Sequence, residues 1–173
     1  DFCLSRGLGD VYKRQVSEIK QLLADLKSAN YHIAIATGRP RTETIVPFET
    51  IGIKSYFDEV HIVTASEVLI AEDLYPELKP LGKPNPFSYL ATLEGNHQDK
   101  YRHYATNQEN RVDKDEVFVV GDSLADLLSA KKIGATFIGP LTGLKGIHAR
   151  DELVDYGADY IVDHVGEIRN ILL

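Results

Sequence analysis

The chain of 173 residues has a single cysteine, Cys3, and so offers neither a disulfide framework nor a thiolate metal site. No apolar run approaches the ~18 residues of a membrane span, and no secretory signal is visible. An excess of positive charge is also missing. The formal net charge is -7 and the pI is near 5.3, which argues against nucleic acid or an anionic membrane as the main partner. We expect a cytoplasmic protein, in which an anionic substrate would need local positive charge from a metal ion or a few placed lysines.

The composition is that of one globular domain. Hydrophobic residues make up 43% and charged residues 26% of the chain, which is enough for one substantial core. Regular patterning begins only at Val16. Residues 1–15 show neither helical nor strand periodicity and resemble a translated sequencing-adapter junction. We therefore expect a non-native or disordered tail at 1–15 and a partial core domain at 16–173.

From Val16 onward, short apolar segments alternate with amphipathic ones. The run His32-Ile33-Ala34-Ile35-Ala36 is nearly continuous, as expected for a strand buried on both faces. Residues 64–75 are interpreted as a looser acidic segment, and 94–111 as a solvated excursion that is either irregular or a lengthened helix followed by a loop. The alternation implies an α/β fold with a parallel, Rossmann-like sheet flanked by helices. The predicted strands are 32–36, 60–63, 116–120, 135–138 and 160–162, and the predicted helices are 16–30, 42–48, 87–93, 124–133, 150–156 and 165–172.

Two carboxylates follow the apolar run that ends at Val120. Asp122 and Asp126 stand four residues apart, where the predicted strand turns into a helix. Two carboxylates projected from a strand end form a hard-oxygen site of the kind that Mg²⁺ prefers. Taken alone, the segment fits equally well a helix that is merely capped by Asp122 or Ser123.

Two further features stand at strand or loop ends, where parallel α/β sheets bind their ligands. Thr37 and Gly38 offer a hydroxyl and a backbone N–H to an oxyanion, although an ordinary strand-to-helix turn has the same pattern. Lys83 precedes a predicted helix, where a cation opposes the helix dipole unless an anion shares the site. The alternative for Lys83 is a solvated loop lysine. Arg39 either reaches a substrate anion or is an ordinary surface arginine.

Together these elements resemble the haloacid dehalogenase-like (HAD) hydrolase superfamily. Thr-Gly, Gly-Lys-Pro and Gly-Asp-Ser-x-x-Asp match its second, third and fourth motifs in order and spacing. The strings Ala34-Ile35-Ala36-Thr37-Gly38-Arg39-Pro40 and Leu81-Gly82-Lys83-Pro84 look like those of the phosphoglycolate-phosphatase-type branch. The resemblance implies a phosphatase that cleaves small phosphorylated metabolites through an aspartyl phosphate, with Mg²⁺ as cofactor.

The resemblance also implies a role for each residue. Thr37 and Gly38 would hold the phosphoryl oxygens, and Lys83 would neutralise the phosphate and the nucleophilic carboxylate. Asp122 would bind Mg²⁺ directly, and Asp126 through water or as a brace behind the site. The implied catalytic residues are Lys83 and Thr37, the substrate-binding residues are Thr37, Gly38, Arg39 and Lys83, and the metal ligands are Asp122 and Asp126.

The first motif of the family, a hydrophobic strand that ends in Asp-x-Asp and carries the nucleophile, has no match. Asp1 and Asp10 follow no apolar run, and neither has a partner aspartate two residues on. In the family this strand lies mid-sheet, between the strands that end at Thr37 and Gly121. We therefore expect a HAD-like fold without its first, central strand and without a cap domain. Unpaired strand edges are costly, so we also expect low stability or solubility. Because the nucleophile is missing, we expect no phosphatase turnover.

Other readings stay open. A naturally nucleophile-free regulatory domain would keep the same phosphate and metal pocket. A receiver-type signalling domain is disfavoured, because it would need paired acids after its first strand and the Gly-Asp-Ser-x-x-Asp run is foreign to it. A dehalogenase is also disfavoured, because its chemistry needs no Mg²⁺ site. The Gly-Leu-Lys-Gly string at 143–146 matches the loop of an RNA-binding KH module but is interpreted as a plain loop. His97 and His103 are interpreted as solvated.

Overall fold

The computed structural model describes residues 2–109, 111–143 and 145–173, with side chains described from residue 15 onward. The strands are β1 (Ile35–Ala36), β2 (Ile62–Val63), β3 (Phe118–Val120), β4 (Thr136–Pro140) and β5 (Tyr160–Val162). The helices are α1 (Phe2–Ser28), α2 (Arg41–Thr50), α3 (Ala65–Leu74), α4 (Phe87–Glu94), α5 (Tyr101–Thr106), α6 (Leu124–Ile133), α7 (Ala149–Asp155) and α8 (Arg169–Leu172). Short 3-10 turns are η1 (Lys54–Tyr56), η2 (Glu59–His61), η3 (Pro76–Leu78), η4 (Gln98–Lys100), η5 (Gly146–His148) and η6 (Val165–Ile168).

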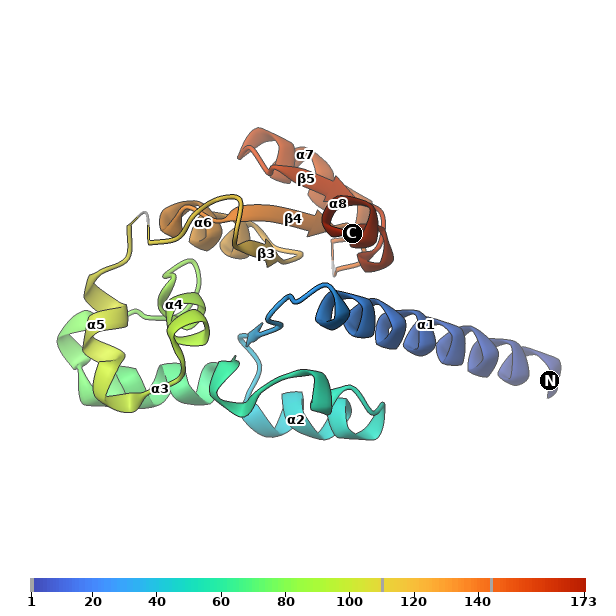
Figure 1. The fold of residues 1–173 in the computed structure, drawn as a ribbon, viewed down its shortest axis with the longest axis horizontal. Coiled ribbons are helices and arrows are strands. Elements are labelled where there is room, and N and C mark those ends of the chain that lie inside the picture. Colours follow the sequence, from blue (N-terminus) through green and yellow to red (C-terminus); the bar gives the residue numbers. More distant parts are fainter. Residues whose placement is uncertain (1, 110, 144) are drawn as a thin grey trace.

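The strands form two parallel sheets, which confirms the predicted α/β class. β1 pairs with β2 in one sheet, and the second sheet has the order β3-β4-β5. Figure 1 shows β3 to β5 together with α6, α7 and α8 in one part of the molecule, and α2 to α5 in the other. The C-terminal end of α1 lies between these two parts.

Within the described residues, β1 and β3 are not hydrogen-bonded to each other or to a strand between them. This is the position at which the family resemblance placed a central strand that the chain does not supply. The prediction that residues 32–36 form a strand buried on both faces is wrong: the strand is limited to Ile35–Ala36, and Ala34 is exposed. On β3, Val120 retains 43% of its accessible surface. In the part of the chain that the structure describes, β1 and β3 each have a partner strand on one edge only.

Helix α1 begins at Phe2, so the prediction that regular structure starts at Val16 is wrong. The packed part of the helix is the predicted one, with Leu22, Leu23 and Leu26 buried. Once such a segment is helical, each added residue gains one hydrogen bond and the helix extends easily. Helical backbone does not test whether residues 1–15 are foreign to the natural protein, and that remains a prediction. At the other end, Asn30 has a φ of +67°, a conformation that stops the helix.

The acidic segment 64–75 and the polar segment 94–111 each contain a helix. Residues 65–74 form α3, whose N-terminus carries a capping box between Thr64 and Glu67. Residues 101–106 form α5, in agreement with the helical alternative, but Tyr101 and Tyr104 are almost fully buried, so the predicted solvation is wrong there. Both rings contact Phe87 of α4, with centroid distances of 5.4 Å and 6.4 Å. These aromatic contacts join α4 and α5.

The buried side chains fall into two clusters. The larger one joins α4, α5, α6, β3 and β4, and includes Phe87, Leu127 and Phe137. The smaller one lies where α1, η1 and β2 meet, and includes Leu23 and Ile62. Within the described part of the chain, no helix combines the length and the apolar character needed to cross a membrane.

Candidate functional site

Lys83 lies between the two sheets. Its Nζ donates to the backbone carbonyl of Ala36 at 2.8 Å and to Oδ1 of Asp126 at 2.7 Å. The Thr37 N–H donates to Val63 of β2, so the carbonyl of the preceding Ala36 points to the opposite, open side of β1. The ammonium therefore satisfies an edge carbonyl of one sheet and a carboxylate that follows the edge strand of the other. An ammonium has three donors, and these two contacts leave one for a ligand.

Asp126 is surrounded by donors. Its Oδ1 accepts from Lys83 and from the Tyr89 hydroxyl at 2.8 Å, and its Oδ2 accepts from the Ser123 hydroxyl at 2.7 Å. Burial by itself would raise the pKa of this carboxyl. The Lys83 charge and the hydrogen bonds from Lys83, Ser123 and Tyr89 outweigh burial and hold the pKa below its usual value. Burial and the charges of Asp126 and Asp122 raise the pKa of Tyr89, so its hydroxyl keeps its proton and donates.

The helix cap at this position is Ser123. Its Oγ accepts from the Asp126 backbone N–H at 3.2 Å, and α6 begins at the next residue. The capping alternative thus applies to Ser123, while Asp122 is exposed and makes no hydrogen bond or ion pair within the described residues. A Cβ on Gly143 would lie 2.0 Å from Asp122 Oδ2, and one on Gly121 would lie 2.5 Å from the Asp126 Cβ. Only glycine fits at either position without displacing a carboxylate.

This arrangement fits one Mg²⁺ ion bound through few protein ligands. Among the described residues, no three His, Cys, Asp or Glu side chains converge on one point. Mg²⁺ is commonly held by one or two carboxylates together with waters and substrate phosphates, and an exposed carboxylate such as Asp122 suits that role. Asp126 is turned to Lys83, Tyr89 and Ser123, which is the geometry of a brace behind the site.

The turn after β1 leaves polar groups open. The Thr37 hydroxyl oxygen accepts from the Arg39 N–H at 3.2 Å, so the segment forms a compact strand-to-helix turn. The Thr37 hydroxyl proton and the Gly38 N–H have no partner in the described chain, and nothing lies within 4 Å of where a Gly38 Cβ would stand. Arg39 is exposed, and its side chain makes no described contact. Because Ala36 precedes Thr37, the turn lies next to the Lys83 ammonium.

One Asp-x-Asp string does occur in the chain, Asp113-Lys114-Asp115, and sequence reasoning passed over it. It precedes β3 and therefore lies at the amino end of that strand, opposite the end that carries Asp122. Asp113 accepts from the Asp115 N–H, and Lys114 pairs with Asp159 at 2.6 Å. These aspartates support a turn at the far edge of the sheet and are not placed to act as the nucleophile beside Lys83.

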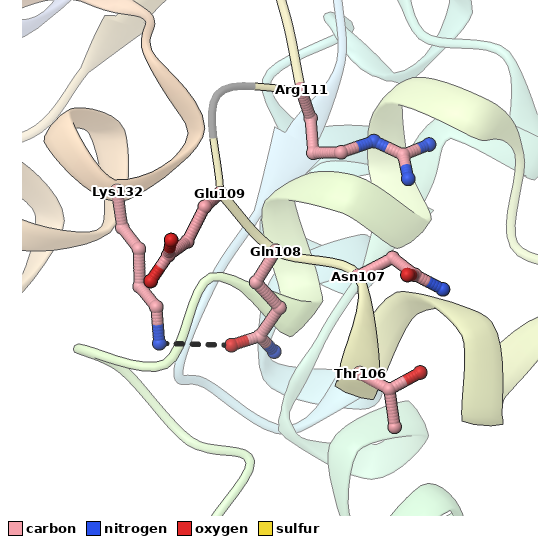
Figure 2. A pocket seen from close by; sticks show the side chains of 6 residues that line it. All are labelled: Thr106, Asn107, Gln108, Glu109, Arg111 and Lys132. Atoms are coloured by element: carbon pink, nitrogen blue, oxygen red, sulfur yellow. Dashed lines mark hydrogen bonds between the residues drawn. The ribbon is translucent and has the colours of Figure 1, made fainter.

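A polar pocket opens beside the segment that carries Lys83. It is lined by Thr106, Asn107, Gln108, Glu109, Arg111 and Lys132. Figure 2 shows Lys132 directed at the Gln108 amide, whose oxygen accepts from Lys132 at 3.1 Å. The Gln108 nitrogen donates to Asn85 at 2.6 Å, and Asn85 in turn accepts from the Phe87 N–H at the start of α4. The hydrogen bonds of Gln108 therefore link the pocket to Asn85 and help to fix the segment that carries Lys83.

Neither Gln108 nor Tyr89 was among the predicted site residues. Gln108 is in a polar stretch with no periodicity, and Tyr89 has the spacing of an ordinary core residue of α4. Of the other candidates, His97 and His103 are exposed, as predicted. The Gly-Leu-Lys-Gly loop includes Leu144, which lies outside the described residues.

The sequence profile of the haloacid dehalogenase-like hydrolases matches residues 12–139. The chain therefore belongs to the haloacid dehalogenase-like hydrolase family, as its motifs predicted. Phosphoglycolate phosphatase of Vibrio parahaemolyticus is 27% identical over 154 residues, which cover 89% of this chain and 54% of that protein. The chain thus spans about half the length of that relative.

Two solved structures share the fold. The X-ray structure of a Northeast Structural Genomics Consortium target superposes with a TM-score of 0.89 at 61% sequence identity, covering 91% of this chain and 41% of that one. A conserved haloacid dehalogenase-like protein of unknown function from Agrobacterium tumefaciens matches with a TM-score of 0.53 at 22% identity, covering 80% of this chain and 52% of that one. The second likeness concerns the fold alone.

Proposed function

We propose that this chain carries the phosphate-binding and magnesium-binding part of a phosphatase that acts on small phosphomonoesters in the cytoplasm. One observation carries the proposal. Lys83 is anchored by Ala36 and Asp126 with one N–H free, and it stands beside the open Thr37–Gly38 turn. A fixed cation next to a hydroxyl proton and a backbone N–H that have no partner among the described residues is suited to a phosphoryl group. The phosphatase relatives agree with this choice of substrate class.

Each residue then has a defined task. Thr37 and Gly38 donate to phosphoryl oxygens, Arg39 adds a second cation at the mouth of the turn, and Lys83 offsets the charge that develops in the transition state. Asp122 would hold Mg²⁺, which supplies electrostatic stabilisation of the phosphoryl oxygens when bound. Asp126 keeps Lys83 in place.

We also propose that this chain alone does not hydrolyse a phosphomonoester. The reaction requires a nucleophilic carboxylate that faces Lys83. Asp126 has both oxygens engaged, Asp122 is assigned to the metal, and Asp113 and Asp115 lie at the opposite edge. In the whole phosphatase an aspartate from outside this chain would form the aspartyl phosphate.

Binding and turnover are measured separately. Calorimetry with orthophosphate, with and without Mg²⁺, should detect binding to the wild-type chain and at least about tenfold weaker binding to Lys83→Met, the loss expected for one charged hydrogen bond. Lys100→Met, which removes an exposed lysine of η4, should bind like wild type. Equal affinities for the two variants would contradict the role of Lys83.

Turnover is assayed with p-nitrophenyl phosphate and Mg²⁺. We expect no hydrolysis above the background of Lys83→Ala. Clear Mg²⁺-dependent hydrolysis that Lys83→Ala abolishes would show that the chain holds its own nucleophile, and that part of the proposal would then be wrong.

A second candidate is a regulatory domain that binds phosphate and magnesium without catalysis. It is supported by the same donors and by the same lack, among the described side chains, of a free carboxylate that faces Lys83. Sequencing the genomic locus upstream of the Val16 codon separates the two: a continuous frame with an apolar strand that ends in Asp-x-Asp supports the phosphatase, and a start codon near Val16 supports the regulatory domain.

A further inference from the structure

The Lys83–Asp126 pair rests against a third side chain. Tyr89 lies on α4, and its hydroxyl donates to the same Asp126 oxygen that accepts from Lys83. The Lys83 Nζ lies 4.8 Å from the centre of the Tyr89 ring. One tyrosine thus contacts the carboxylate with its hydroxyl and the ammonium with its ring.

The helix that carries this tyrosine is itself fixed to β1. The Thr92 hydroxyl, one turn further along α4, lies 3.1 Å from the Ile35 carbonyl and 2.7 Å from the Ser88 carbonyl of its own helix, and its single proton is shared between these two acceptors. The Ile35 and Ala36 carbonyls therefore hold α4 and Lys83 to the same strand. The position of Tyr89 relative to the Thr37 turn is determined by this frame and does not depend on a mobile loop.

We propose that Tyr89 is a positioning residue, which holds the Lys83 ammonium so that its free N–H faces the phosphate; this inference rests on the proposed function of Lys83. A lysine side chain has four rotatable bonds, and fixing it at the moment of binding weakens affinity. An aromatic face attracts the ammonium electrostatically, and the hydroxyl keeps the carboxylate turned toward it. Together they fix the cation before the anion arrives.

The direct test is the nitrogen NMR signal of the lysine ammonium groups, recorded on the ¹⁵N-labelled chain at low temperature. The Lys83 signal is identified by its loss in Lys83→Met. In the wild type we expect a signal that exchanges slowly with water and is displaced by the ring current of Tyr89. A Lys83 ammonium that exchanges as fast as the exposed lysines and shows no such displacement would overturn the proposal before any Tyr89 variant is made.

Two substitutions separate the hydroxyl from the ring. Tyr89→Phe should retain the displacement but exchange about tenfold faster, because Asp126 loses one of its donors. Tyr89→Leu should lose both the displacement and the slow exchange. The matched control is Tyr104→Phe, which removes another buried hydroxyl, bonded to the Gly95 carbonyl at 2.7 Å, and should leave the Lys83 signal unchanged.

A purely structural role gives a different result. If Tyr104→Phe alters the Lys83 signal as much as Tyr89→Phe does, or if neither Tyr89 variant alters it, the positioning role is wrong. Titration with orthophosphate is a separate arm. A Lys83 signal that does not respond to phosphate in the wild type contradicts the proposed function, whereas the Tyr89 comparison is read without phosphate and keeps its meaning.

Discussion

Replacing Asp126 by asparagine removes a buried charge while keeping the volume of the side chain. The side chain of Asp126 retains 8% of its accessible surface and that of Lys83 retains 19%, so the substitution leaves an ammonium largely shielded from water without its counterion. Removing one partner of a buried ion pair costs about 3–5 kcal/mol. Because the exposed fifth of Lys83 is partly screened by water, we expect a loss of about 2–3 kcal/mol in the free energy of unfolding.

Urea unfolding measures this loss. With a slope of about 2 kcal/mol per M for a chain of this size, the midpoint of Asp126→Asn should fall by about 1–1.5 M. The double variant with Lys83→Met should recover part of the loss, because an apolar side chain no longer needs a counterion, and a coupling of about 1–3 kcal/mol is expected. Glu77→Gln breaks the exposed pair with Arg102 and should cost less than about 0.5 kcal/mol. Strictly additive effects of the two site substitutions would refute the ion-pair reasoning.

Three further outcomes follow from the site and its surroundings. Gly143→Ala should weaken Mg²⁺ binding measured by calorimetry, since the added Cβ would displace Asp122. Gly82→Ala adds a Cβ that meets no atom within 4 Å and should bind Mg²⁺ as the wild type does. Equal affinities of the two variants would contradict the close packing of Gly143 against Asp122. Folding lowers the pKa of Asp126, so the stability that its charge contributes is complete above about pH 4 and is lost as the pH falls through the folded-state pKa. The stability of Asp126→Asn should therefore fall less steeply in acid than that of the wild type. Identical profiles of stability against pH would contradict this contribution of Asp126. Thr64→Ala removes a helix cap and should lower the midpoint of thermal unfolding by an amount equivalent to about 1 kcal/mol, and an unchanged midpoint would show that α3 does not need the cap.

The sequence predicted the elements whose determinants are local. Helix α6 has the predicted bounds because its periodicity, the Ser123 cap and Gly134 in the left-handed conformation at its end all act within a few residues. Helix α3 was missed although Thr64 and Glu67 spell a capping box. The burial of its residues is the reverse of what their polarity suggests, since Leu69 is 61% exposed and Glu67 is buried. Glu67 can be buried because its carboxylate accepts hydrogen bonds from the helix cap and pairs with Arg41.

The site was predicted as separate groups, and the structure adds how they are connected. The motifs named Lys83 and Asp126 as individual residues, but spacing along the chain does not show that they pair or that Ala36 supplies the second acceptor. Tyr89 and Gln108 could not be identified, because their roles depend on the packing of α4 against α6 and on a contact with Asn85. Burial of such polar side chains is decided by distant partners rather than by local propensity.

The contact between the Lys83 ammonium and the Ala36 carbonyl has one more consequence. At that carbonyl the ammonium does what the peptide N–H of an adjoining strand would do. An N–H of any segment that adds to this edge of β1 would therefore meet a carbonyl that Lys83 already engages. Strand addition at this edge and the position of the Lys83 ammonium are thus coupled to each other.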